Sequence, residues 1–144
     1  MYRSKENNEM EVLLVHPGGP FWKNKDAGSW TIPKGEVSDG EDELQAAIRE
    51  FKEETGIKPE EPFFSLGEVK QKSGKIVKAW AFKGDCDPAN IKSNTFSIEW
   101  PPKSGKMTEF PEIDRAEFFG IDEAVIKINP AQISFIEKLV SSSK

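Results

Sequence analysis

Residues 35–57 read GEVSDGEDELQAAIREFKEETGI, and this acidic stretch decides how the chain is interpreted. Inside it, Glu50, Glu53 and Glu54 stand at i, i+3 and i+4, so they share one face of a predicted helix. In a cleft, at roughly 5.5 Å and an effective dielectric of about 20, two such charges repel by roughly 3 kcal/mol. A divalent cation reverses the sign of this interaction, and hard cations prefer carboxylate oxygens. The stretch therefore predicts a helix whose glutamates face a metal ion.

Signals at both ends set the limits of this helix. Ser38 and Glu41 fit a capping box, with Ser38 at the N-cap and Glu41 three residues later. Gly56 supplies the left-handed position that follows the last turn. Apolar side chains at i, i+4 and i+7 form a stripe predicted to pack on the core, namely Leu44, Ile48 and Phe51. Because one flank is buried, we expect the carboxylates to be held toward a cleft.

The spacing of the whole stretch matches a known motif. Residues 35–57 carry every fixed position of G-x5-E-x7-R-E-U-x-E-E-x-G-U, where U is a bulky apolar residue, and they resemble the Nudix box. WTIPKG at 30–35 resembles the lead-in to this box in some branches of the family. EFPEIDR at 109–115 and FF at 118–119 resemble the strand that closes the site in bacterial members. The chain thus resembles a bacterial-type nucleoside triphosphate pyrophosphohydrolase of the Nudix hydrolase family.

The resemblance implies a metal and its ligands. Glu50 and Glu54 are the best candidates for binding Mg²⁺, with Mn²⁺ as a substitute, and the carbonyl of Gly35 is a further candidate ligand. Glu53 is implied to be either a ligand or the general base. Without the spacing, three glutamates on a helix would indicate a solvated face. Glu41, likewise, could serve as no more than a helix cap.

The resemblance also implies the catalytic residues Glu53, Glu109 and Arg49. Members of the family differ in where the base lies, and some use a glutamate outside the box, which here would be Glu109 or Glu112. Glu109 is preferred because the sequence predicts a loop at that position. Arg49 is expected to orient Glu53 at i+4 without touching the substrate.

Three side chains are candidates for binding the substrate, namely Lys34, Trp22 and Trp30. Lys34 could meet a phosphate as a point charge, or it could lie on the surface. Trp22 could stack on a nucleobase or pack under its loop, and Trp30 could line the cleft or belong to the core. We expect substrate selectivity to reside in the loops at 18–28 and 90–106.

The remaining pattern predicts an α/β fold. Strands are expected over 11–16, 63–71, 75–82, 95–100 and 115–119, and helices over 121–128 and 131–140. An N-terminal strand has room only at residues 1–3, so either that strand is very short or the chain starts late. His16 is expected to end its strand in a satisfied environment. The resemblance implies a Nudix-type α/β/α sandwich with a mixed β-sheet, in which the box helix faces the active-site cleft.

Length and composition limit the classes of protein. At 144 residues, with 31% charged and 36% hydrophobic residues, we expect one domain spanning 1–144. A net charge of −5 argues against broad nucleic-acid binding, although a local basic patch is compatible with it. Cys86 is the single cysteine, and no apolar run reaches about 18 residues. We expect a cytoplasmic location, no membrane partner and a small-molecule nucleotide as partner, with a homodimer left open.

These observations lead to one leading function and two alternatives. The leading function is Mg²⁺-dependent hydrolysis of a diphosphate bridge, by attack of water on phosphorus, in a nucleoside triphosphate, a dinucleoside polyphosphate or a similar nucleotide. The first alternative is a pyrophosphohydrolase acting on the 5′ end of RNA, against which the acidic balance counts mildly. The second is a non-catalytic nucleotide-sensing domain on the same fold, which has no need of the complete acidic set.

Overall fold

The computed structural model describes residues 1–5, 7, 9–33, 41–71, 74–91 and 93–142. The elements follow one another as β1 (Tyr2–Ser4), β2 (Met10–Pro17), α1 (Glu43–Thr55), β3 (Phe64–Lys70), β4 (Ile76–Ala81), β5 (Thr95–Glu99), β6 (Met107–Pro111), β7 (Ile113–Gly120), α2 (Ile121–Lys127) and α3 (Ile133–Ser142). Short 3-10 turns precede β5, at Pro88–Asn90, and α3, at Pro130–Gln132.

The apolar strand β2 forms the centre of an antiparallel sheet with the order β1-β2-β7. Its residues 12–16 are buried, and Leu13 lies opposite Phe118 of β7. β1 has three residues, and it pairs with β2 from Tyr2 opposite Val12 to Ser4 opposite Met10. Tyr2 of β1 also forms a parallel bridge to Lys83, just after β4. The strands are therefore arranged in a mixed fashion, as predicted.

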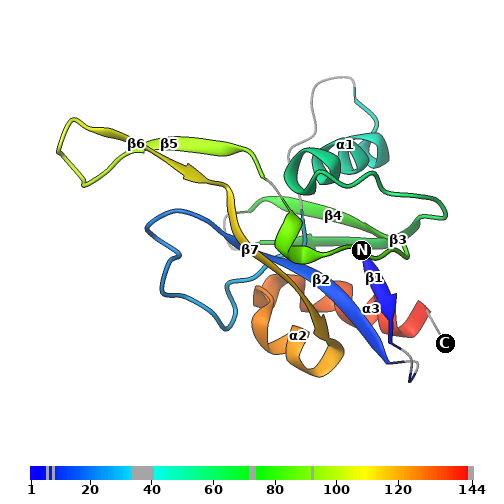
Figure 1. The fold of residues 1–144 in the computed structure, drawn as a ribbon. Helices are drawn as coiled ribbons and strands as arrows, with labels where there is room; N and C mark the ends of the chain where they lie inside the picture. The colour runs from blue at the N-terminus through cyan, green and yellow to red at the C-terminus, as the bar shows by residue number, and fades with distance from the viewer. Residues whose placement is uncertain (6, 8, 34–40, 72–73, 92, 143–144) are drawn as a thin grey trace.

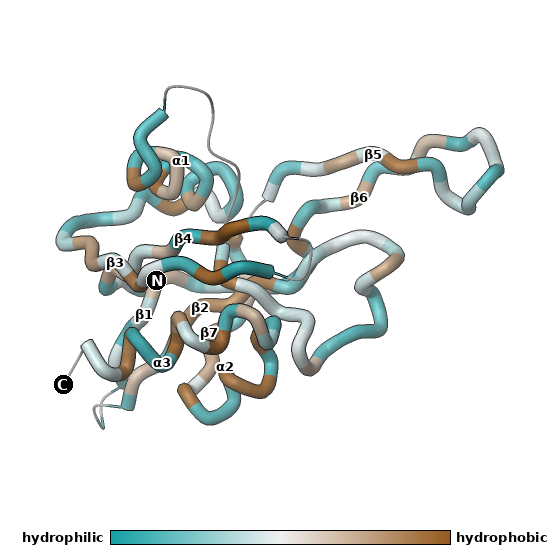
Figure 2. The backbone as a smooth tube through the Cα atoms, turned by 180° about the vertical axis from the view of Figure 1, so that it is seen from behind, coloured by the Kyte–Doolittle hydropathy of each residue, from teal (hydrophilic) through white to brown (hydrophobic). Residues whose placement is uncertain are grey.

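Helices cover the strands on two sides (Figure 1). α1 packs against β4 on one side, whereas α2 packs against β2 and β7, and α3 packs against β3. Hydrophobic residues are concentrated on parts of β4, β5 and α2 (Figure 2). This arrangement agrees with the predicted α/β/α layers. The largest fully buried side chains of the core are Leu13, Leu14, His16, Trp30, Ile128, Gln132 and Phe135.

The box helix α1 begins later than predicted. Its N-cap is Asp42, whose carboxylate accepts a hydrogen bond from the backbone N–H of Gln45 at 3.2 Å. Aspartate is as effective an N-cap as serine, and this one lies where its oxygen reaches the N3 amide. The predicted capping box is therefore wrong, because Glu41 precedes the cap and binds Arg49 instead. Ser38 lies outside the described residues.

The other end of α1 is as predicted. Gly56 has φ 76° and ψ 6°, and its N–H donates to the carbonyl of Lys52 at 2.7 Å. A Cβ at this position would meet no atom within 4 Å. The left-handed backbone, and not lack of space, is therefore what favours glycine here.

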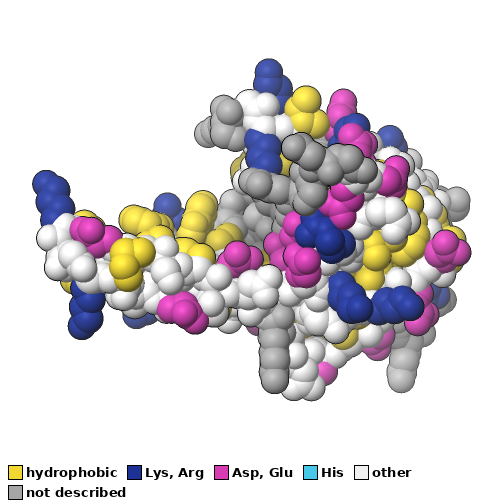
Figure 3. All heavy atoms as spheres, turned by 90° about the horizontal axis from the view of Figure 1, so that it is seen from above, with side chains coloured by type: hydrophobic (Ala, Val, Ile, Leu, Met, Phe, Trp, Pro, Cys, Tyr) yellow, Lys and Arg dark blue, Asp and Glu magenta, His cyan; other side chains and the backbone are white. Residues whose placement is uncertain are grey.

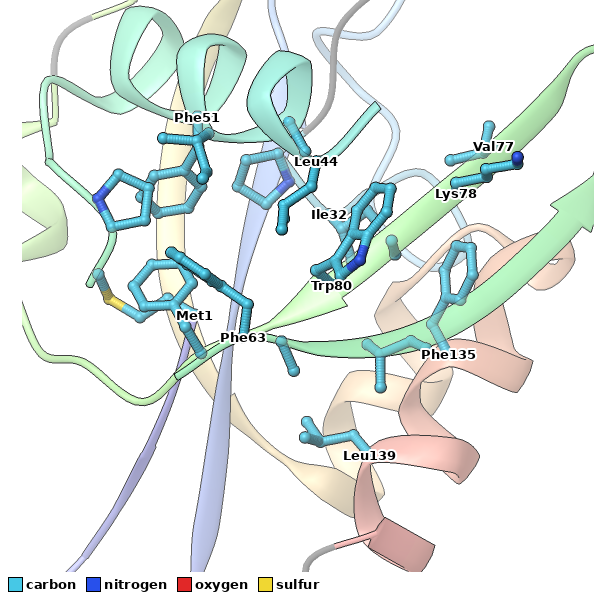
Figure 4. A pocket seen from close by; sticks show the side chains of 18 of the residues that line it. Met1, Ile32, Leu44, Phe51, Phe63, Val77, Lys78, Trp80, Phe135 and Leu139 are labelled. Atoms are coloured by element: carbon cyan, nitrogen blue, oxygen red, sulfur yellow. The ribbon is translucent and has the colours of Figure 1, made fainter. Parts of the chain in front are cut away.

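An apolar cavity of about 500 Å³ separates α1 from the β3–β4 hairpin (Figure 4). Leu44 and Phe51 point toward it from α1, Trp80 from β4 and Phe135 from α3. The predicted apolar stripe of α1 thus faces the interior. Phe51 is buried, but Leu44 and Ile48 are only half-buried because they line this cavity.

β5 and β6 form a hairpin that projects away from the rest of the molecule (Figure 1), and we call residues 95–111 the arm. In its ladder, Phe96 lies opposite Phe110, and Ser97 lies opposite Glu109. The loop predicted around Glu109 is therefore wrong, since this residue belongs to a strand. The strand signal is weak in the sequence because Pro111 ends the run and polar residues alternate with few β-branched ones.

Candidate functional site

Arg49 lies at the centre of a cluster of carboxylates on and beside α1. Its Nε donates to Oε2 of Glu41 at 2.7 Å, and its Nη2 donates to Oε1 of Glu41 at 2.8 Å. Such bidentate pairs are directional as well as strong. Glu41 therefore ties the segment before α1 to the second turn of the helix. The sequence predicted for Glu41 only a place in a helix cap, and this pair with Arg49 was missed although Glu41 is a fixed position of the box.

The same guanidinium binds two of the predicted metal-site glutamates. Its Nη1 donates to Oε1 of Glu50 at 2.9 Å and to Oε2 of Glu53 at 3.2 Å. Hydrogen bonds to Glu41, then to Glu53 and Glu50, raise the pKa of Arg49 further above its usual range, although desolvation opposes this effect. The contact with Glu53 is the i+4 pair that the sequence predicted. Arg49 thus offsets the repulsion among carboxylates that share one face.

The oxygen atoms of this cluster suit a hard divalent cation. Glu50, Glu53 and Glu54 come from one face of a single helix, and carboxylate oxygens are the ligands that Mg²⁺ and Mn²⁺ prefer. The side chain of Glu50 is 19% exposed and that of Glu53 is 45% exposed, so both are accessible from solvent. Within the described part of the chain, no three His, Cys, Asp or Glu side chains converge as a metal site would require. In this arrangement Arg49 binds oxygens of both Glu50 and Glu53.

Two contacts fix α1 against the strands beneath it. At its start, Nζ of Lys78 on β4 lies 2.7 Å from Oε2 of Glu43. In its middle, the ring of Phe51 meets the ring of Phe82 edge to face, with centroids 5.1 Å apart. An ion pair this exposed contributes little, so the aromatic contact is the stronger anchor. The glutamates are therefore presented by a helix that is held on its apolar side.

Trp30 belongs to the core, so its assignment as a substrate-binding residue is wrong. Its side chain is 1% exposed, and its Nε1 donates to Oδ1 of Asp26 at 2.8 Å. The ring meets Phe119 edge to face at 5.0 Å. A large apolar ring with a satisfied N–H is stabilised in the interior, which is why the core alternative holds.

His16 has the satisfied environment that the sequence predicted. Its ring is fully buried, with Nδ1 2.7 Å from Oδ1 of Asp114 and Nε2 2.7 Å from the carbonyl oxygen of Lys25. A carbonyl can only accept, so Nε2 carries a proton in this bond. His16 thereby fastens the loop that follows β2 to the body of the protein.

Trp22 lies in that loop and is exposed to solvent. The Nζ of Lys25 lies 4.9 Å from the centre of its ring, within the range of a cation–π contact. The neighbouring ring of Phe21 meets Trp100 of the arm edge to face at 5.6 Å. The loop and the arm therefore present aromatic rings together, and a role for Trp22 in binding a base stays a prediction.

The remaining predicted residues lie elsewhere. Glu109 is exposed on β6, and Glu112 is exposed between β6 and β7, so a role for either as the base stays a prediction. Lys34 and Gly35 lie outside the described residues. Figure 3 shows acidic and basic side chains side by side on the body of the molecule, and hydrophobic side chains both along the arm and in patches on the body.

The NUDIX domain family matches residues 3–139 of the chain. The chain belongs to the Nudix hydrolase family. The predicted family is therefore confirmed, and with it the predicted enzyme class, a hydrolase that acts on phosphoanhydrides. The mixed α/β fold is that of other Nudix hydrolases.

Individual Nudix relatives cover the chain to different extents. This chain is 66% identical over 61 residues to the asymmetrical bis(5′-nucleosyl)-tetraphosphatase of Caenorhabditis elegans. The matched segment covers 42% of this chain and only 39% of that protein. The chain is 28% identical over 128 residues to the RNA pyrophosphohydrolase of Agrobacterium fabrum, covering 78% of this chain and 69% of that protein. A crystal structure of a C. elegans Ap4A hydrolase binary complex matches with a TM-score of 0.67 and 26% identity, over 99% of this chain and 92% of that one.

None of the helices in the described part of this Nudix protein is both long enough and apolar enough to cross a membrane.

Proposed function

We propose that this protein hydrolyses a diphosphate bridge in a nucleoside diphosphate linked to another moiety, with Mg²⁺ as cofactor. The observation that carries the proposal is the arrangement on α1, where Arg49 gathers Glu41, Glu50 and Glu53 at hydrogen-bonding distance. The complete box spacing supports the same chemistry. A nucleoside triphosphate or a dinucleoside polyphosphate fits this substrate class, and likeness to the worm tetraphosphatase favours the second.

The residues of α1 would hold the cation and keep their geometry. Glu50 and Glu54 are the proposed ligands, with Glu53 and the carbonyl of Gly35 as further candidates. When bound, a divalent cation neutralises phosphate oxygens and lowers the pKa of its bound water. Arg49 keeps the carboxylates from turning away from one another, so less reorganisation is needed when the substrate arrives.

A carboxylate would take the proton from the attacking water. Glu53 is one candidate, because it is exposed on the same helix face and its oxygens are shared with Arg49 at the longer distance of 3.2 Å. Glu109 is the other, and its place in β6 gives it a more rigid backbone than a loop would. Comparing Glu53→Gln with Glu109→Gln in single-turnover measurements across pH identifies the base, since only loss of the base removes the acidic limb of the rate profile.

The test of the proposal is the variant Glu54→Gln. Loss of a ligand carboxylate removes several kcal/mol of charge stabilisation, so kcat should fall at least about a hundredfold. Release of phosphate or pyrophosphate from a panel of nucleotides reports the activity, and calorimetric titration with Mg²⁺ reports weaker metal binding independently. The control is Glu60→Gln, an exposed glutamate outside the helix, which should leave both readouts unchanged. Full activity of the Glu54→Gln variant would contradict the proposal. Undiminished turnover by the wild-type protein in excess chelator would also contradict it.

A second candidate function is removal of pyrophosphate from the 5′ end of RNA. The observation that favours it is the 28% identity to the RNA pyrophosphohydrolase of A. fabrum, which extends over 128 residues and so beyond the box. Comparing a mononucleotide with a short 5′-triphosphorylated RNA under the same conditions decides between the two substrates. A higher kcat/KM for the RNA would support the second candidate.

A further inference from the structure

The loop after β2 and the arm form one unit, because glycines let them lie against each other. The N–H of Gly18 donates to the carbonyl of Glu112 at 2.8 Å. A Cβ on Gly18 would lie 1.9 Å from the carbonyl oxygen of Pro111, a distance that no side chain can adopt. Gly19 has φ 98°, and a Cβ there would lie 2.8 Å from the ring of Phe96. We call residues 18–26 and 95–112 the loop–arm surface.

Large hydrophobic side chains are exposed on this surface. Phe21 is 64% exposed, Trp22 is 38% exposed and Met107 is 65% exposed. They make up three of the six large hydrophobic residues that are exposed in the described part of the chain, and the other three lie on the body. Phe21 also holds the ring of Trp100 edge on, which makes the surface aromatic on both the loop and the arm.

The charge of the loop–arm surface differs from that of the chain. Four lysines balance four acidic residues in it, whereas the whole chain carries −5. Lys103 and Lys106 lie in the turn at the tip of the arm, where neither has an acidic partner among the described residues. Lys25 lies over the ring of Trp22. Cations thus accompany the aromatic rings along the surface and continue to its far end.

An isolated two-stranded hairpin is marginally stable in water, and the contacts of the arm with the loop after β2 stabilise it here. Lys103 and Lys106 at its tip favour an anionic occupant. Aromatic rings interleaved with lysines suit single-stranded nucleic acid, whose bases stack without regard to sequence. The tip projects away from the body (Figure 1), so phosphates bound there belong to nucleotides beyond the one whose bridge is cut.

We propose that the loop–arm surface binds the nucleotides that follow the 5′ end of a single-stranded RNA. The inference rests on the proposed hydrolysis of a diphosphate bridge and deepens its second candidate, because it extends the substrate of the same site from a nucleotide to an RNA chain. A mononucleotide would reach the glutamates of α1 without using the tip of the arm. The loop–arm surface would therefore determine preference for RNA and not the hydrolysis itself.

The test measures how tightly the protein binds a single-stranded RNA of about ten nucleotides that carries a 5′-hydroxyl. Quenching of tryptophan fluorescence reports the binding. Because this RNA has no diphosphate bridge, binding is measured apart from hydrolysis. Trp22→Ala should weaken binding about tenfold or more, since stacking on that ring is lost. The double variant Lys103→Gln and Lys106→Gln should lower the slope of log K against log salt concentration by about 0.7 for each lysine.

Matched controls come from the body of the protein. Ile126→Ala removes an exposed apolar side chain on α2, and the double variant Lys70→Gln and Lys83→Gln removes two exposed charges. Both should bind the RNA as the wild type does. Equal affinity of all variants, or no quenching in the wild type, would overturn the inference and leave the proposed hydrolysis standing. A concentration-dependent dimer that excludes the RNA and is abolished by Met107→Glu would also overturn it, by assigning the surface to a second copy.

A different outcome is that the protein binds the RNA but hydrolyses no nucleotide. The loop–arm surface would then be supported, and the proposed function would fail. For 5′-triphosphorylated RNA, the loop–arm variants should lose more kcat/KM than they lose for a mononucleotide. An equal loss for both substrates would show that the surface does not distinguish them.

Discussion

A single guanidinium serves three carboxylates in this Nudix site, which makes Arg49 a positioning residue. It uses Nε and Nη2 on Glu41 and Nη1 on both Glu50 and Glu53. A planar fork with five donors can do this, whereas an ammonium group is a point charge on a flexible stem. The identity of residue 49 is therefore set by geometry as well as by charge.

The change Arg49→Lys keeps the positive charge and removes this geometry. We expect kcat to fall about 10- to 100-fold with little change in KM, because supporting residues of metal sites have effects of this size. Calorimetric titration with Mg²⁺ should show weaker binding in parallel, which a purely structural role would not produce. Lys52→Ala, an exposed change on the same helix, is the control. Wild-type kcat together with wild-type Mg²⁺ affinity in Arg49→Lys would contradict the positioning role.

At the scale of elements, the end of α1 depends on one backbone conformation. Gly56→Ala should lower the free energy of unfolding by about 1 kcal/mol, because alanine is strained at φ 76° and no steric clash adds to this cost. Urea unfolding followed by circular dichroism measures the change. Gly56→Asn should recover part of the stability, since asparagine tolerates the left-handed region better. Equal stability of the alanine variant and the wild type would show that the helix end relaxes freely.

The accuracy of the sequence predictions differs between elements for physical reasons. Local signals sufficed for β2, whose apolar run is buried on both faces, and for the end of α1, where glycine is required. They failed where two residues compete for one role, as when Asp42 caps α1 in place of Ser38. They also failed for Glu109, because its strand exists through pairing with β5 and not through its own composition.

The site itself was predictable only in part. The box spacing identified the glutamates and the i+4 contact of Arg49, since both are fixed by helix geometry. The bidentate pair with Glu41 joins residues on either side of the helix start, so its geometry depends on where the helix begins. Burial of Trp30 depends on contacts with Asp26 and Phe119, which sequence spacing does not reveal.

At the scale of the whole molecule, ion pairs join segments that are distant in the sequence. The Asp26 carboxylate binds Lys127 at the end of α2 and also accepts the indole N–H of Trp30. The hydrogen bond from Lys127, and then that from Trp30, hold the pKa of Asp26 below its usual value of 3.8. This carboxylate therefore links the loop after β2 to the opposite end of the chain.

The lowered pKa of Asp26 predicts how stability depends on pH. A carboxyl group whose pKa is lower in the folded state stabilises the fold above its usual pKa, and this contribution is lost as the pH falls through the lowered value. Asp26→Asn should therefore be less stable than the wild type at neutral pH, and the difference should shrink as the pH falls below 3.8. Urea midpoints measured from pH 7 down to about pH 2 test this. Glu60→Gln, without an ion-pair partner among the described residues, should show no such convergence. A difference between Asp26→Asn and the wild type that stays constant with pH would mean that the amide loses packing or hydrogen bonds and that the charge is not responsible.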